Sequence, residues 1–424
     1  MDYVQKCFYD ASGWNDDLSY EQILRTSNNL MHFPIPSGFK LSISSKNTEY
    51  SYSSLTLSQL SRLTGSLSYL YSSIDLKNTY LGTASLPLRL ILDDYRFVKS
   101  PQQQRLQDAH FTPTGQPRPC ILYGKMYFPS QFLEGMLIKR ISKNVQLMMK
   151  FINTPKLRKL ANNSTIVTLY LQRQKGNSST DFIFSSNESL LGFRCLYKIG
   201  SDLSSSPGGI SDSTSLSLGF ELWFALMSMS PGLSTALRYS THLSSSGKPL
   251  TMTLALNPLL GTIESTYAIK SGLNSTLSSK YTFNIYSYES DLLFGFSLLR
   301  SSEPPNRAVP PKSPLPSTLP ITSSRHQPFK SLDEETHHRL LTTFMGINPG
   351  KLVTENNARH FMDTFNHLNF SSGLKCCASI AKKDLNVAWE GRFKDLLISS
   401  GLRIDCSEAI PKMGKYGIEI QYSS

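Results

Sequence analysis

Long apolar runs are missing from this sequence. No stretch of the 424 residues reaches the ~18 consecutive apolar residues that a membrane-spanning helix needs. The longest candidate, from Leu222 to Leu237, is interrupted by Ser228, Ser230 and Pro231. We therefore do not expect a bundle of transmembrane helices.

The beginning of the chain has few basic residues. Lys6 is the only one before Arg25, and several acidic residues lie between them. A secretory signal needs a basic start followed by an apolar core, and a transit peptide is Arg-rich and poor in acids. Neither pattern is present, so we expect any targeting information to lie elsewhere in the chain.

Charged residues and cysteines are scarce. Charged residues make up 17% of the chain, which is low for a soluble globular protein. The six cysteines show neither CxxC spacing nor a compact disulfide framework, which favours free thiols in a reducing compartment. The net charge of +12 comes from scattered Lys and Arg without a binding motif, so we expect no nucleic-acid partner.

Motifs for catalysis and for cofactor binding are missing as well. The sequence contains no GxSxG motif, Walker-type loop or dinucleotide fingerprint. His337, His338, His360 and His367 lie near one another but lack cysteine or carboxylate partners at ligand spacing. We expect no enzyme activity, no metal and no cofactor.

What the sequence does contain is alternation of apolar and polar residues. Phe39, Leu41 and Ile43 alternate with polar neighbours, and the same period recurs to the end of the chain. Further examples are the stretches Leu67 to Tyr71, Leu86 to Leu92, Val145 to Phe151, Leu191 to Ile199 and Leu216 to Leu226. About a dozen such segments in series are typical of transmembrane β-strands. A soluble sandwich or propeller also alternates, but its strands are shorter and a propeller repeats a signature, which we do not find.

Two segments depart from this period. In residues 1–35, Val4, Cys7, Phe8 and Ala11 follow helical spacing, which predicts a short amphipathic helix. Residues 301–370 begin with a Pro/Ser-rich stretch, since eight of the 23 prolines lie between Pro304 and Pro328. We interpret this second segment as an extramembrane excursion from a single barrel that spans residues 36–424.

The fold class predicted from the residues is all-β, a closed transmembrane β-barrel. Closure is required because an open sheet edge in hydrocarbon would leave backbone groups without hydrogen bonds. With ~9–11 residues for each spanning strand, the barrel has strands in the high teens. Glycines inside expected strands, such as Gly65, Gly124, Gly219 and Gly295, indicate bulges or tight curvature.

The last strand carries the most specific local pattern. Lys415, Gly417, Ile420 and Tyr422 follow the order polar, any, glycine, any, any, hydrophobic, any, hydrophobic. This order looks like the sorting signal of mitochondrial β-barrel precursors. Ile420 and Tyr422 would share the lipid face, and Gly417 would allow close backbone pairing with the assembly machinery. An ordinary final strand would show the same alternation.

Several stretches together resemble the fungal mitochondrial distribution and morphology protein 10 family. They are Gly65–Tyr71, Tyr123–Pro129, Leu133–Arg140, Ser230–Tyr239, Ser275–Ser290, Trp389–Arg392 and Lys415–Tyr422. The resemblance covers nearly the whole chain except residues 301–370. It implies a mitochondrial porin-like barrel of about nineteen strands, closed by one parallel pair, with the N-terminal segment associated with the lumen.

The resemblance also implies a location in the mitochondrial outer membrane and two scaffold roles. One role is to anchor the ER–mitochondria encounter structure, whose lipid-transfer subunits exchange phospholipid and influence mitochondrial morphology. The other is to join the barrel and cytosolic subunits of the sorting and assembly machinery and help to assemble the translocase of the outer membrane. Membrane lipids are the remaining expected partner. The alternative is a porin-like channel or import pore that conducts solutes or ions.

Two aromatic pairs are candidates for partner docking. Tyr69 and Tyr71 point the same way from one strand, and Tyr281 and Phe283 do so from a late strand. Because strands near the two ends of the chain meet in a closed barrel, we expect both pairs to flank one region of the wall. The alternative is that they pack against lipid.

Overall fold

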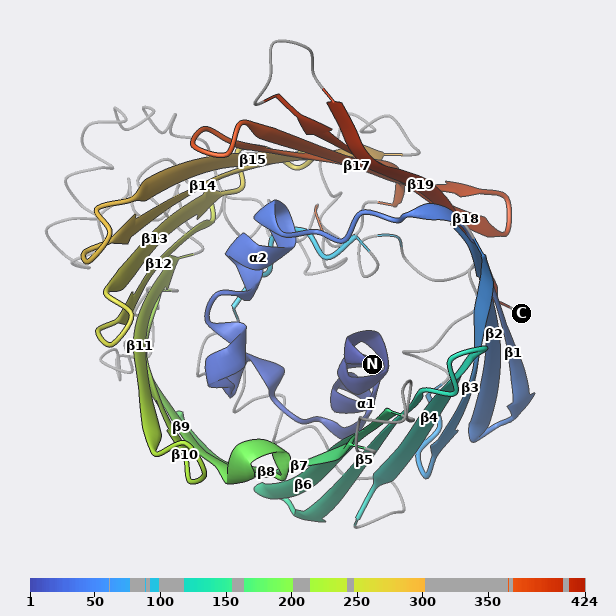
Figure 1. Cartoon of the computed structure of the whole chain (residues 1–424), viewed down its shortest axis with the longest axis horizontal. Helices are drawn as coiled ribbons and strands as arrows, with labels where there is room; N and C mark the ends of the chain where they lie inside the picture. Colours follow the sequence, from blue (N-terminus) through green and yellow to red (C-terminus); the bar gives the residue numbers. More distant parts are fainter. Residues whose placement is uncertain are drawn as a thin grey trace, which may run out of the picture.

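The nineteen strands of the described residues form one closed barrel (Figure 1). The computed structural model describes residues 1–60, 62–76, 88, 92–98, 118–154, 164–200, 214–241, 248–301, 365, 369–406 and 412–423. The strands are β1 (Gly38–Thr48), β2 (Ser51–Gln59), β3 (Leu63–Ser72), β4 (Cys120–Phe128), β5 (Leu133–Ser142), β6 (Val145–Thr154), β7 (Ser164–Lys175), β8 (Ser178–Ser185), β9 (Leu190–Gly200), β10 (Thr214–Ala225), β11 (Ser230–Thr241), β12 (Leu250–Asn257), β13 (Thr262–Ile269), β14 (Ser275–Asn284), β15 (Ser290–Ser301), β16 (Phe370–Ser379), β17 (Asp384–Phe393), β18 (Leu396–Asp405) and β19 (Lys412–Ser423).

Each strand pairs antiparallel with its predecessor, and the barrel is closed by a parallel pair between β1 and β19. An odd number of alternating strands makes the first and the last run in the same direction, so the closing pair has to be parallel. Its register runs from Gly38 opposite Gly417 to Ser44 opposite Ser423. The predicted fold class is confirmed. Among the described helices, none is long and apolar enough to cross a membrane.

The two faces of the wall differ as the alternation predicts. In β3, Leu67, Tyr69 and Tyr71 point outward and are exposed, whereas Ser66 and Ser68 point inward and are buried. The other strands except β16 and β18 likewise expose large apolar or aromatic side chains on their outer face. An apolar surface of this extent is far larger than soluble monomers carry and is typical of a wall that faces lipid.

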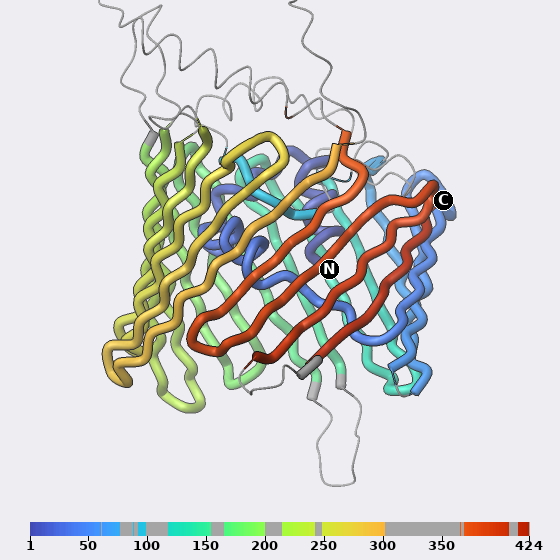
Figure 2. The backbone as a smooth tube through the Cα atoms, turned by 90° about the horizontal axis from the view of Figure 1, so that it is seen from above, coloured from blue at the N-terminus to red at the C-terminus, as the bar shows by residue number. Residues whose placement is uncertain are grey.

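The N-terminal segment, residues 1–35, lies inside the barrel (Figures 1 and 2). It contains α1 (Asp2–Ser12), the 3-10 helices η1 (Asp16–Leu18) and η2 (Tyr20–Gln22), and α2 (Arg25–Met31). A second segment, residues 92–98, also contacts the inner wall, and we call it the inner segment. One more 3-10 helix, η3 (Asn187–Ser189), lies in the turn between β8 and β9.

The strand predicted from Leu86 to Leu92 is wrong where the structure describes it. The amide N–H of Leu92 donates to the carbonyl oxygen of Leu88 over 3.0 Å, which is a helical hydrogen bond. Both side chains are buried with Leu299 and Phe370. The leucines therefore form an internal cluster, and their period of two does not reflect a lipid-facing strand.

The bulges expected at four glycines are also absent. Gly65, Gly124, Gly219 and Gly295 all lie in uninterrupted strand registers. Of the predicted excursion at 301–370, residues 302–364 lie outside the described residues, as do His337, His338, His360 and His367, so those predictions stay untested.

Candidate functional site

Helix α1 packs on an apolar part of the inner wall. Phe8 and Tyr9 are 0% and 3% exposed and form one buried cluster with inward-facing side chains of β2 to β6. The wall members are Tyr52, Leu70, Ile121, Met136, Ile138 and Met148. A water-filled barrel would present polar residues here, so the inner wall is built to bind this helix. Burial raises the pKa of the Cys7 thiol, on the same helix, to about 11.

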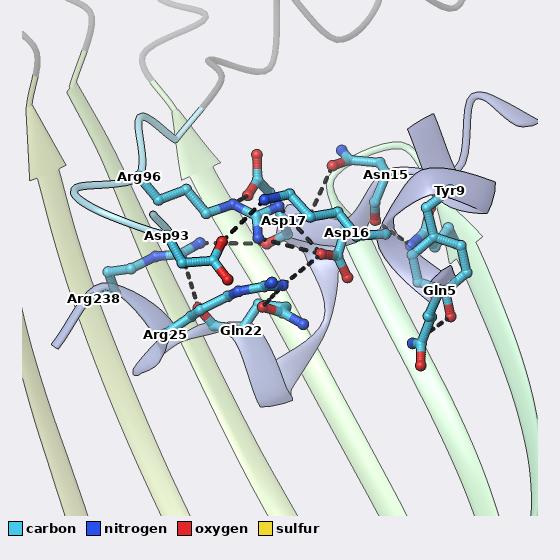
Figure 3. Close-up of polar contacts among 12 residues, drawn as sticks. Gln5, Tyr9, Asn15, Asp16, Asp17, Gln22, Arg25, Asp93, Arg96 and Arg238 are labelled. Carbon is cyan, nitrogen blue, oxygen red and sulfur yellow. Dashed lines mark hydrogen bonds and ion pairs between the residues drawn. The ribbon is translucent and has the colours of Figure 1, made fainter. Parts of the chain in front are cut away.

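Two adjacent carboxylates form the centre of an ionic cluster inside the barrel (Figure 3). Asp16 Oδ2 lies 3.0 Å from Arg25 Nη1 and 3.2 Å from Arg96 Nη1. Arg96 Nε lies 2.8 Å from Asp17 Oδ1. Burial alone would lower the pKa of Arg96, but the carboxylates of Asp17 and Asp16 raise it. The cluster joins the inner segment to η1 and α2, although Arg96 and Asp16 are 80 residues apart in the sequence.

The wall itself donates hydrogen bonds to backbone carbonyls of the N-terminal segment. Arg238 of β11 is 3% exposed and donates to the carbonyl oxygens of Gln22 and Asp17, over 3.1 and 3.3 Å. Gln174 of β7 donates to the carbonyl oxygen of Asn15 over 2.6 Å. Asp17 and Gln22 lie near the C-terminal ends of η1 and η2, where carbonyl groups lack partners within the helix.

A second ionic contact holds the inner segment. Lys270 Nζ lies 3.0 Å from Asp94 Oδ2, and the two side chains are 0% and 4% exposed. Thr276 donates to the same carboxylate over 3.1 Å. Tyr95 forms a 2.8 Å hydrogen bond with Thr251 through its hydroxyl. The inner segment is therefore fixed to the wall at β12 and at the turn between β13 and β14.

Glycines of the wall lie where the N-terminal segment comes closest. A Cβ atom at Gly219 would lie 2.7 Å from the Tyr20 ring and 2.8 Å from Ile23 Cδ1. A Cβ atom at Gly295 would lie 3.1 Å from the carbonyl oxygen of Leu30. These two glycines provide room for η2 and α2, which explains their presence inside strands.

The predicted sorting-signal residues lie at the closing seam of the barrel. Gly417 pairs with Gly38 of β1 and with Gly401 of β18. Tyr422 faces outward and is exposed, Ile420 on the same face is half-buried, and Lys415 is exposed near the start of β19. Recognition of these four residues by an assembly machinery stays a prediction.

The seam also carries an ion pair. Lys40 Nζ of β1 lies 2.7 Å from Glu419 Oε1 of β19. Just before β1, Ile35 and Pro36 pass over the inner face of β18, where a Cβ atom at Gly401 would lie 2.9 Å from Ile35 Cγ2. The N-terminal segment thus leaves the lumen directly at the seam.

The structure does not bring the two predicted docking pairs together. Tyr69, Tyr71 and Tyr281 point outward and are 53%, 42% and 45% exposed, and Phe283 is half-buried on the same face as Tyr281. However, β3 and β14 lie on nearly opposite sides of the barrel (Figure 1). The expectation that both pairs flank one region of the wall is wrong, because β14 is still far from the seam.

No sequence pattern predicted the groups that fasten the internal segments, which include Asp17, Arg96, Arg238 and Lys270. One signal was present: Arg238 is a lone cation at an inward position of a strand otherwise made of apolar and hydroxyl residues. None of the six cysteines forms a disulfide bond. Within the part of the chain that the structure describes, no group of three His, Cys, Asp or Glu residues is placed to hold a metal ion.

Comparison with known proteins gives one consistent result. The sequence model of a family described as Mitochondrial distribution and morphology protein 10 matches residues 1–424. A relative of that name from Candida tropicalis is 41% identical over 458 aligned residues, which cover 100% of this chain and 99% of the relative. Relatives of the same name from Candida dubliniensis and Meyerozyma guilliermondii are each 40% identical, with the same coverage.

Proposed function

Because the chain belongs to the mitochondrial distribution and morphology protein 10 family, we propose that it is a scaffold of the mitochondrial outer membrane. In one complex it anchors the ER–mitochondria encounter structure by holding soluble lipid-transfer subunits, which supports phospholipid exchange and normal mitochondrial morphology. In the other it joins the barrel and cytosolic subunits of the sorting and assembly machinery. There it aids insertion of barrel proteins and assembly of the translocase of the outer membrane.

The observation that carries this proposal is the fastening of the N-terminal segment inside the barrel. Its contacts reach from β5, where Arg140 donates to the carbonyl oxygen of Ser12, to β18, where Gly401 meets Ile35. The ionic and apolar contacts are buried, so moving the segment would expose unpaired charges and apolar surface together. A barrel whose inner wall holds its own chain suits a rigid platform, with its outer face and rim available for partners.

Catalysis has no support. The family and the barrel fold are not a known enzyme class. We infer that the protein works by binding other proteins and membrane lipids, and that it uses neither a cofactor nor nucleic acid.

A channel is the second candidate, and one observation favours it. Several inward positions of β1 to β3 carry small hydroxyl residues, with Ser42 beside Thr56 and Ser54 beside Ser68. These hydroxyls lie away from α2, and in a channel they would line the water path. A conducting barrel would show voltage-dependent steps when the purified chain alone is added to a planar bilayer.

The experiment that tests the scaffold is a pull-down from digitonin-solubilised mitochondria with an affinity-tagged full-length chain. We expect two sets of partners by mass spectrometry, the lipid-transfer subunits and the subunits of the sorting and assembly machinery. An unrelated tagged outer-membrane barrel, expressed at the same level, serves as the control. Recovery of neither set, together with channel steps in the planar bilayer, would overturn the scaffold in favour of the channel.

A further inference from the structure

Three consecutive hairpin turns at one end of the barrel are strongly apolar. They connect β10 to β11, β12 to β13, and β14 to β15, and we call residues 226–229, 258–261 and 285–289 the rim turns. All three lie along the lower edge in Figure 2. Their exposed large side chains are Leu226, Met227, Met229, Leu259, Leu260, Ile285, Tyr286 and Tyr288. Met227 and Tyr288 are 78% and 80% exposed, whereas surface turns ordinarily consist of Gly, Pro, Asn, Asp and Ser.

The rim turns contain one charged residue, Glu289, at the end of the third turn. Their sequences are Leu-Met-Ser-Met, Pro-Leu-Leu-Gly and Ile-Tyr-Ser-Tyr-Glu. Neighbouring turns at the same end are more polar: the turn between β8 and β9 is Ser-Asn-Glu-Ser, and that between β16 and β17 contains Lys382 and Lys383. The apolar character is therefore specific to β10–β15, and it is not a general feature of this end.

The backbone of the rim turns is hydrogen-bonded within the protein. Asn257 accepts from the amide N–H of Leu260 through Oδ1, over 3.1 Å. Asn284 Oδ1 accepts from the amide N–H groups of residues 286 and 287, over 2.8 and 3.1 Å. The amide of Ile285 donates to the carbonyl oxygen of Gly261 over 2.7 Å. Such bonds from an Asn side chain to amide groups two or three residues on hold a turn in one conformation.

Two of the rim turns are also packed together. The Tyr286 ring lies over Gly261, where an added Cβ atom would be 2.6 Å from the ring. The Tyr286 hydroxyl donates to the carbonyl oxygen of Pro258 over 3.0 Å. The rim turns are consequently an ordered surface. Tyr286 and Tyr288 have the amphipathic ring that prefers the membrane–water interface.

The rim turns continue the lipid-facing wall without a polar gap. On β10 the outward positions Leu222 and Phe224 lead directly to Leu226, and on β14 Tyr281 and Phe283 lead to Ile285. Because successive outward positions are two residues apart, the apolar strip extends past the end of the sheet into the turns.

We propose that the rim turns are embedded in the lipid bilayer, at the boundary between headgroups and acyl chains of one leaflet. The occupant of this surface is phospholipid. On the β10–β15 side the bilayer then covers the ends of the hairpins, while the turn with Lys382 and Lys383 stays in water. This inference goes beyond the scaffold function and needs only that the barrel is inserted in a membrane.

Photo-crosslinking in mitochondria that contain radiolabelled phospholipid tests the proposal. The photoreactive residue benzoylphenylalanine replaces Leu260 or Tyr288 in the full-length chain. Leu254, an outward residue in the middle of β12, is the positive control, and the exposed Lys382 is the control on the same rim. We expect phospholipid adducts at positions 254, 260 and 288, and at least fivefold less adduct at position 382.

Three results would overturn the proposal. Adducts of discrete protein mass at positions 260 and 288, without phospholipid, would show that a protein partner covers the rim. Adducts at position 254 alone would place the turns in water. If position 254 also gave no adduct, the barrel would not be embedded in lipid, and the proposed outer-membrane scaffold would fail with it.

Discussion

Gly417 lies directly opposite Gly38 in the parallel pair that closes the barrel. A Cβ atom at Gly417 would be 2.5 Å from the carbonyl oxygen of Gly38 and 2.7 Å from that of Pro36. Both neighbours are backbone atoms, so no side-chain movement can relieve the overlap. The closing pair of strands thus requires a residue without a side chain at position 417, which is also the glycine of the predicted sorting signal.

We predict that Gly417→Val prevents stable closure of the barrel. The added side chain would separate β1 from β19 and expose backbone groups at the seam, which is costly in a membrane. Carbonate extraction after import of the precursor should recover less than a fifth of the wild-type amount in the membrane pellet. Gly414→Val is the control, since the nearest atom to a Cβ there is 3.8 Å away. Normal integration of Gly417→Val would show that the seam can open to fit the side chain.

The outward face of β19 gives a separate prediction. Ile420→Lys places a charge on the lipid side, at a cost of ~2–4 kcal/mol near the midplane and less toward the interface. Integration should fall severalfold, while Gln421→Lys, on the opposite face of the same strand, should integrate normally. Crosslinking of the arrested precursor to the assembly machinery then separates two causes. Lost crosslinks indicate a recognition signal, and retained crosslinks indicate a residue that matters only for the final membrane position.

The buried pair of Lys270 and Asp94 predicts a large loss of stability. Lys270→Met leaves the Asp94 carboxylate buried without its ammonium partner, and breaking such a pair typically costs ~3–5 kcal/mol. Urea unfolding of the purified barrel in detergent micelles measures the free energy of unfolding. The double variant Lys270→Met with Asp94→Leu should recover most of the loss. Lys382→Met, at an exposed turn, should change the free energy of unfolding by less than ~0.5 kcal/mol. Equal stability of all four proteins would show that the pair contributes nothing.

Alternation identifies which face of a strand is apolar, but it does not identify what lies inside the barrel. The period of two predicted β3, β10 and β14 because each has a lipid-facing row of large side chains. The same period wrongly predicted a strand at Leu88 and Leu92, where apolar side chains pack inside the barrel. Partners such as Lys270 and Asp94, 176 residues apart, meet only after closure, so no local pattern reveals them. At Gly219 and Gly295 the reason for a glycine, contact with the N-terminal segment inside the barrel, depends on that same closure. Gly65 and Gly124 have no such contact.

Gly219 tests whether contact with the wall holds the N-terminal segment. Gly219→Leu would overlap Tyr20 and Ile23, and an overpacked site typically costs ~1–3 kcal/mol. The segment should then leave the wall, and trypsin should cleave after Arg25 at least fivefold faster in the intact membrane. Gly124→Leu, on the outward face of β4 beside the exposed Leu122 and Met126, is the control for a Gly-to-Leu change that does not touch the segment, because a Cβ atom at Gly124 meets nothing within 4 Å. Equal cleavage of both variants would contradict a role for Gly219 in positioning the segment.

The separation of the two aromatic pairs predicts that they act independently. From β14 through β19 to β3 there are eight strand-to-strand steps, or about 38 Å along the wall at the usual strand spacing. A compact partner that docks on Tyr69 and Tyr71 therefore does not reach Tyr281 and Phe283.

Replacing one pair with alanine should release one complex on native gels and leave the other intact, since aromatic residues dominate interface hot spots. Tyr239→Ala with Tyr267→Ala, at outward tyrosines of similar exposure, controls for lost contact with lipid. If either docking variant removes both complexes, or if the control does the same, the aromatics stabilise the wall and do not select a partner. Loss of a different complex from each variant would assign one partner to each side of the barrel.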